Sequence, residues 1–128
     1  MMQNHAKCDT IAQREKIWIA LSEFYLDTEL NDQDLKRIAT IFKESEFTLP
    51  EIKEIDLYEV FPVLQYNLNS VAGEWGMFDP HMIRENCYNM YLKKYNPFFR
   101  LKIKFLNLFF YRMRGRYWDK VEKHLMKS

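Results

Sequence analysis

The feature that most constrains the fold is a helix start signal that recurs along the chain, each time followed by apolar residues at helical spacing. "TLPE" at residues 48–51 is a capping box with a proline in the first turn, where its missing N–H costs little. Asp79 before Pro80 is a second start of this kind. "TIAQ" at residues 10–13 predicts a helix that begins at Thr10, after a flexible segment 1–9.

The second helix is expected to start at Asn31 or Asp32, after the polar turn "DTELNDQD". The apolar positions that recur every three or four residues should face the core. They are Ile17, Trp18, Leu21, Phe24 and Tyr25, then Leu35, Ile38, Ala39 and Phe42, and then Ile52, Ile55 and Tyr58.

Two interruptions mark the middle of the chain. Pro62 lies within the otherwise helical run "LYEVFPVLQYNL", so a kink or a helix junction is expected there. In "SVAGEWGMFDP" (residues 70–80), Gly73 suits the left-handed residue that ends a helix and Gly76 allows a further turn. This segment therefore predicts a corner between two helices, with a ligand-gripping loop as the alternative.

The C-terminal part is basic and rich in aromatic residues. "NP" at 96–97 ends the helix that begins at Pro80, and "FFRLKIKFLNLFFYRMRG" (98–115) then shows one narrow polar stripe. Gly115 is expected to break this helix before a last one. Both apolar rows of the run should pack into the domain. The first row is Phe99, Ile103, Leu106 and Phe110, and the second is Phe98, Leu101, Phe105 and Phe109.

These patterns predict an all-α fold, a compact bundle of about six helices that forms a single domain over residues 1–128. The chain is long enough to bury a core without disulfides or metal. Charges interrupt the apolar run at 98–114, which is too short to span a membrane. Cys8 and Cys87 have no paired-ligand spacing, and the first residues lack an apolar signal region, so we expect a cytoplasmic protein with free thiols.

Charge is divided unequally along the chain. Residues 1–92 carry 16 acidic and 8 basic side chains, whereas residues 93–128 carry 11 basic and 2 acidic ones. The asymmetry indicates either that the basic part folds back on the acidic part or that each face meets its own partner.

Signatures of catalysis and of cofactor binding are missing from the sequence: there is no P-loop, GxGxxG, HExxH or GxSxG. His81 and Glu85 stand one helical turn apart, but a metal site would need a third ligand that the sequence does not place. We therefore expect neither an enzyme nor a cofactor or metal.

Three stretches resemble a family of small, uncharacterised bacterial helical proteins: "ALSEFYLDTEL" (20–30), "YEVFPVLQYNL" (58–68) and "SVAGEWGMFD" (70–79). The resemblance covers about residues 14–90. Small proteins of this kind are similar in style to the immunity proteins of bacterial toxin systems. The resemblance therefore implies a non-catalytic protein that neutralises a cognate toxin by direct binding.

For such a toxin the acidic turn after the first helix is the predicted landing site, because it gathers carboxylates that can attract a basic partner. Its members are Asp27, Glu29, Asp32 and Asp34. Glu74 and Trp75 join them as an exposed corner that carries an aromatic ring and a charge. The alternative is a nucleic-acid or membrane-surface module that uses the basic C-terminal helices, although the polar stripe is narrow for nucleic acid. An enzyme with an unrecognised site is the third hypothesis.

Overall fold

The computed structural model describes residues 2–26, 29–64 and 78–126, with side chains described from residue 11 onward apart from 110, 112 and 113. Every regular element in these ranges is helical, so the predicted all-α class is confirmed. The elements are α1 (Met2–Ser22), the 3-10 turn η1 (Glu23–Tyr25), α2 (Asp32–Glu44), α3 (Leu49–Ile55), the π-helical turn η2 (Asp56–Val60), α4 (Phe61–Leu64), α5 (Pro80–Lys93) and α6 (Pro97–Met126).

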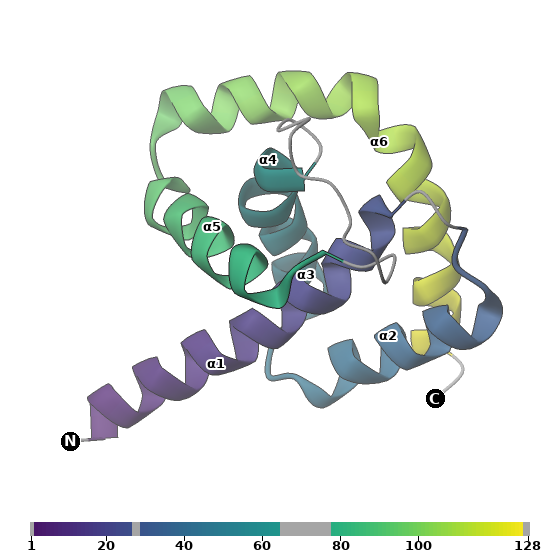
Figure 1. Cartoon of the computed structure of the whole chain (residues 1–128), viewed down its shortest axis with the longest axis horizontal. Helices are drawn as coiled ribbons and strands as arrows, with labels where there is room; N and C mark the ends of the chain where they lie inside the picture. Colours follow the sequence, from purple (N-terminus) through teal and green to yellow (C-terminus); the bar gives the residue numbers. More distant parts are fainter. Residues whose placement is uncertain (1, 27–28, 65–77, 127–128) are drawn as a thin grey trace.

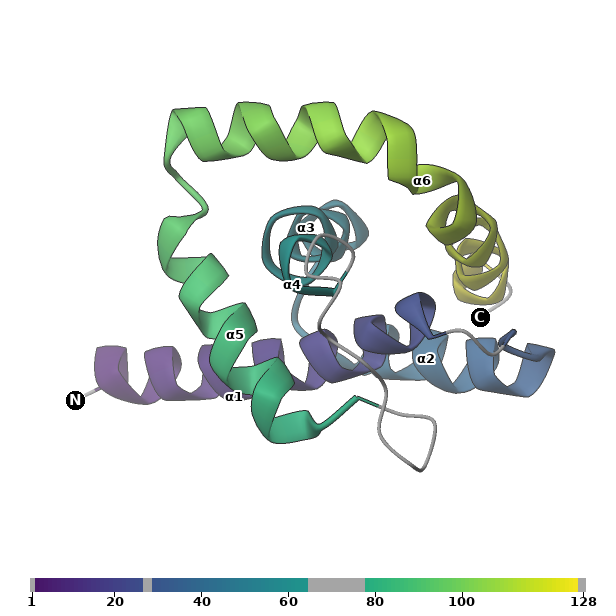
Figure 2. The same ribbon diagram turned by 45° about the horizontal axis from the view of Figure 1, so that its top comes forward.

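The helices form a ring around one central column. The column is the uninterrupted series α3, η2 and α4, which Figure 2 shows nearly end-on with α1, α5 and α6 around it. The first and last helices both pack against the column, and α2 packs against α6, whose C-terminal part crosses it (Figure 1). All the apolar positions assigned to the core of α1 to η2 from their spacing are buried.

Three helix starts are confirmed in atomic detail. The backbone N–H of Asp34 donates to the side chain of Asn31 at 2.8 Å, and the Asp34 carboxylate accepts from the backbone N–H of Asn31 at 3.1 Å. Thr48 and Glu51 form the same reciprocal pair at the start of α3. The carboxylate of Asp79 accepts from the backbone N–H two residues on and caps α5.

The start of α1 corrects the prediction. The helix begins at Met2, so Thr10 lies inside it and does not cap it, and residues 2–9 are helical. Residues 2–13 contain neither proline nor glycine and include good helix formers, so nothing in the chain stops the helix from extending past the capping pattern. The N-terminal end of α1 projects beyond the other helices (Figure 1).

Pro62 lies at a junction, as predicted. It is the second residue of α4, directly after the π turn in which the backbone N–H of Phe61 donates to the carbonyl of Asp56. A π turn is one of the ways in which a helix accommodates a local disruption of its hydrogen-bond ladder. The predicted corner around Gly73 and Gly76 lies outside the described residues.

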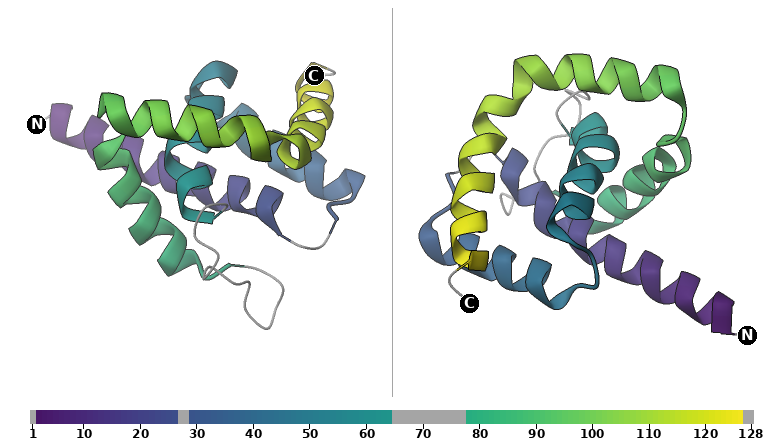
Figure 3. Two further views of the ribbon diagram at one scale, coloured as in Figure 1. Left: turned by 90° about the horizontal axis from the view of Figure 1, so that it is seen from above. Right: turned by 180° about the vertical axis from the view of Figure 1, so that it is seen from behind.

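The course of α6 is a second correction. Gly115 does not break it, and one helix runs through 30 residues and bends in its middle part (Figure 3). A glycine inside a helix lowers its stability without ending it when both sides continue to pack. A Cβ atom added at Gly115 would lie 3.0 Å from the ring edge of Tyr111, so the missing side chain leaves room for this ring.

Candidate functional site

The π turn carries two buried carboxylates. Asp56 contacts residues of η1 and α6, and Glu59 contacts residues of α1 and the residue just after α5. The Asp56 carboxylate accepts the hydroxyl of Tyr25 at 2.5 Å and the indole N–H of Trp118 at 3.1 Å. Its charge is balanced by Arg114, whose Nε lies 3.4 Å away and whose side chain is 1% exposed. This cluster joins α6 to the column and to η1.

The Glu59 carboxylate makes the equivalent contacts with the first helix. It accepts the indole N–H of Trp18 at 2.8 Å and lies 3.2 Å from the guanidinium of Arg14. The ammonium of Lys94, just after α5, lies 3.8 Å from the same carboxylate. Glu59 thus ties α1 and the end of α5 to the column.

Both carboxylates are held by the same sequence pattern. Arg14 with Trp18 and Arg114 with Trp118 are arginine–tryptophan pairs one helical turn apart, so each pair presents a cation and an indole N–H from one helix face. Sequence reasoning placed Trp18 in the core but missed the two arginines and Trp118. The signal that could have found them is this Arg-x-x-x-Trp repeat together with two acidic residues inside the apolar run "IDLYEVF".

Burial sets the ionisation of both clusters. It raises the pKa of Asp56 and of Glu59 above their usual values, against the stabilising effect of the nearby arginines and donors. The pKa of Tyr25 is raised well above its usual value, first by burial and then by the Asp56 charge. Each carboxylate accepts hydrogen bonds from buried donors, so both act as links between the column and the outer helices.

A small cavity of about 170 Å³ lies against the Glu59 cluster. Charged residues of both signs line it, and they include Arg14, Lys94, Arg100, Glu51 and Glu54. Its volume is below the range of roughly 300–1,000 Å³ that is usual for small-molecule sites. The cavity suits a few water molecules better than a substrate.

The predicted acidic turn is present in part. Glu29 and Asp32 are exposed, whereas Asp34 closes the capping box and lies 3.7 Å from Arg37. Asp32 is 3.0 Å from the ring nitrogen of His124. Asp27, Glu74 and Trp75 lie outside the described residues. Asp32 and Asp34 thus each have a basic neighbour, and the turn is less negative than its sequence indicates.

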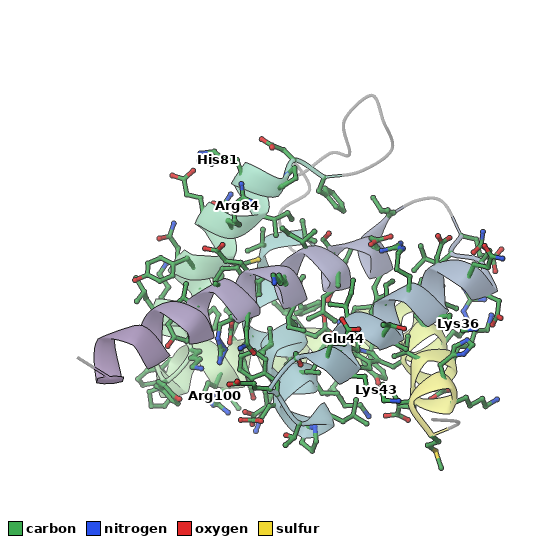
Figure 4. The ribbon with its side chains drawn as sticks, turned by 90° about the horizontal axis from the view of Figure 1, so that it is seen from below. Lys36, Lys43, Glu44, His81, Arg84 and Arg100 are labelled. Atoms are coloured by element: carbon green, nitrogen blue, oxygen red, sulfur yellow. The ribbon has the colours of Figure 1, made fainter. Side chains whose placement is uncertain are left out.

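Asp32 also stands on the rim of an open hollow of about 460 Å³ between α2 and the C-terminal end of α6. The rim carries charges of both signs, from Asp32, Lys36, Lys43 and His124. Figure 4 shows Lys36 and Lys43 on α2 beside the C-terminal part of α6, and His81 on α5 at a distance from them.

The apolar rows of α6 divide differently from the prediction. Ile103 is buried and Phe99 and Leu106 are partly buried, so the first row packs as expected where its side chains are described. The second row is exposed, because the buried side of α6 is occupied by this first row and by Arg100 and Arg114. In the N-terminal half of α6, five large apolar side chains are between 60% and 84% exposed: Phe98, Leu101, Phe105, Leu108 and Phe109.

Metal-ligating side chains do not gather in the described ranges: no three of His, Cys, Asp and Glu come together there. His81 and Glu85 lie 3.7 Å apart on the surface of α5. The thiol of Cys87 is buried, and burial raises its pKa, which keeps it protonated and unreactive. As far as the described helices go, none is long and apolar enough to cross a membrane.

The fold and these clusters define an all-α protein whose outer helices are fixed to a central column through buried carboxylates. The family model described as "Domain of unknown function (DUF7079)" matches residues 12–124, and the chain belongs to this family. The match includes the basic C-terminal region, which the three motif stretches do not reach. No curated protein and no solved structure matches the chain.

Proposed function

We propose that this chain is a non-catalytic binding protein and, more specifically, an immunity protein that neutralises a cognate toxin by direct binding. The observation that carries the proposal is the open, charged hollow between α2 and the end of α6, with the predicted landing residue Asp32 on its rim. The two carboxylates with raised pKa values, Asp56 and Glu59, are engaged by donors and cations inside the core, and the charged side chains around the hollow are available for recognition.

Protein partners suit this hollow better than small ligands do. It is open to solvent and lined by long, flexible charged side chains, whereas small-molecule sites are mostly apolar and enclosed. Carboxylates at the exposed end of α2 would steer a basic surface toward the hollow, and the neighbouring lysines would pair with acidic groups on the same partner.

The experiment uses the protein encoded by the gene next to this one as the candidate toxin. Co-expression should restore growth, and the two purified proteins should form a complex in size-exclusion chromatography with light scattering. The charge-reversal variant Glu29→Lys/Asp32→Lys should slow association at low salt and have less effect at high salt, where steering is screened. Asp34 is left intact because it caps α2.

A matched control is Glu44→Lys/Glu46→Lys, which reverses two exposed charges at the other end of α2. It should associate at the wild-type rate if the landing site is the turn. Equal slowing by both variants would show a general charge effect, and a neighbouring product that is harmless to the cell would remove the immunity assignment.

A further inference from the structure

The N-terminal half of α6 carries an apolar face that points away from the domain. Phe98, Leu101, Phe105, Leu108 and Phe109 recur at spacings of three, four, three and one, which places them on one side of a helix. All five are 60% or more exposed. The rings of Phe105 and Phe109 contact each other with centroids 5.4 Å apart, so the face is continuous. We call these five side chains the α6 ridge.

The orientation of the ridge is fixed by the opposite side of the helix. The guanidinium of Arg100 lies 4.0 Å from the ring centroid of Tyr58 on the column and donates to the carbonyl of Lys94 at 2.9 Å. Ile103 is 3% exposed and packs into the core. These contacts hold α6 so that the ridge remains on the outer edge of the molecule, where Figure 1 shows this half of the helix.

Basic residues border the ridge along its length. Lys102 and Lys104 are exposed, and at 100° per residue they fall on the two opposite margins of the apolar arc. Between Glu85 and Asp119 the sequence contains eight lysines and arginines and no acidic residue. Tyr95, at 77% exposure, lies just before the helix. The ridge therefore has an apolar centre with cationic margins.

We propose that the α6 ridge docks on an anionic membrane surface, with the apolar side chains inserted among the acyl chains and the lysines at the headgroups. This pattern is that of helices lying in the membrane interface. Lysine stems extend along apolar surface while the ammonium groups reach phosphate, and tyrosine is favoured at the same depth. A nucleic-acid site would place its cations at the centre of the face, and pairing with a second copy would bring like charges together.

The site is independent of the proposed toxin contact, which uses the opposite end of α6. Either could fail without the other. Together they would place a toxin-binding protein on the membrane surface.

The experiment is flotation with vesicles of phosphatidylcholine alone or mixed with phosphatidylglycerol. The wild-type protein should bind the anionic vesicles, bind the neutral ones much more weakly, and lose affinity as salt rises. Lys102→Glu/Lys104→Glu should weaken binding by at least about 25-fold, from roughly fivefold for each lysine near an anionic surface. Lys16→Glu/Lys120→Glu, two exposed lysines elsewhere, is the matched control.

The apolar part is tested by Phe98→Gln/Leu101→Gln/Phe105→Gln. These side chains are exposed, so the variant should melt like the wild type and bind at least about tenfold more weakly. Leu92→Gln/Met126→Gln removes exposed apolar groups elsewhere and should leave binding unchanged. In Phe105→Trp, lipids brominated in the acyl chain should quench the new indole, and in Leu92→Trp they should not.

Three outcomes would overturn the assignment. The first is a wild-type protein that fails to float with anionic vesicles at low salt, and the second is a triple glutamine variant that binds as tightly as the wild type. The third is a stable solution dimer, or retention on DNA, that the triple variant abolishes while lipid binding stays weak. That result would assign the ridge to a second copy or to nucleic acid.

Discussion

Replacing Arg114 with methionine tests whether the Asp56 cluster holds α6 to the column. The substitution keeps an unbranched side chain of similar length and removes the cation that balances a carboxylate with a 3% exposed side chain. Tyr25 and Trp118 would still donate to Asp56, but the charge would lie buried without a counter-ion. Removing one partner of a buried pair in this way costs about 3–5 kcal/mol.

The expected effect on melting follows from chain length. Unfolding entropies of ~2.1 cal/mol/K per residue give about 0.27 kcal/mol/K for a domain of this size, so the melting temperature should fall by ~10–20 °C. Thermal denaturation followed by circular dichroism measures the melting temperature, and urea titration at neutral pH measures the free energy of unfolding. Arg116→Met is the matched control, because Arg116 is exposed on the same helix and should change stability by less than about 0.5 kcal/mol.

The double variant Arg114→Met/Asp56→Asn separates loss of charge balance from loss of packing. With both charges gone, no buried ion remains unpaired, so the double variant should be more stable than Arg114→Met alone. Two results would refute the reasoning. One is an Arg114→Met protein that melts within a few degrees of Arg116→Met, and the other is a strictly additive double variant.

Three further changes probe the helix starts, the bend and the buried acids. Thr48→Ala opens the capping box with Glu51 and should cost about 1 kcal/mol in urea unfolding. Gly115→Ala should raise stability by up to about 1 kcal/mol, because Tyr111 is 39% exposed and can shift its ring; a loss would show that the ring is fixed. The raised pKa of Asp56 contributes stability that is full below its usual 3.8 and lost as pH rises through the folded value. Urea titrations from below pH 3.8 upward measure how the free energy of unfolding changes with pH, and Asp56→Asn should remove the part of that change that Asp56 causes. An unchanged pH dependence would assign that part to another group. Glu51 has the opposite sign, since its lowered pKa gives stability above 4.5 that is lost as pH falls.

The helix caps and the buried faces of the first helices could be predicted, because both depend on residues close together in the sequence. The caps at Asn31, Thr48 and Asp79 involve residues within three positions of each other, and all three are confirmed. The spacing of apolar residues identified the buried faces of α1 to η2 for the same reason. The start of α1 was wrong because a capping pattern permits a helix to begin and does not compel it.

The candidate site depended on contacts that no local rule contains. Asp56 and Glu59 are buried because arginines and tryptophans from the two ends of the chain meet them. Both apolar rows of α6 were expected to pack inward, yet Arg114 is 1% exposed and the row with Phe105 lies outside. When a helix carries apolar residues on more than one side, as α6 does, its packing partners decide which side faces the core. The assignment of the acidic turn as a landing site remains a prediction.

The placement of the two carboxylate clusters also sets an order of events during synthesis. Arg14 precedes Glu59 by 45 residues, so the first cluster has its α1 partners as soon as the column emerges from the ribosome. Trp118 follows Asp56 by 62 residues and comes close to the end of the chain. Until α6 is made, Asp56 lacks its cation Arg114 and its indole donor Trp118. A chain cut short before Arg114 should therefore be more sensitive to proteases than the full chain.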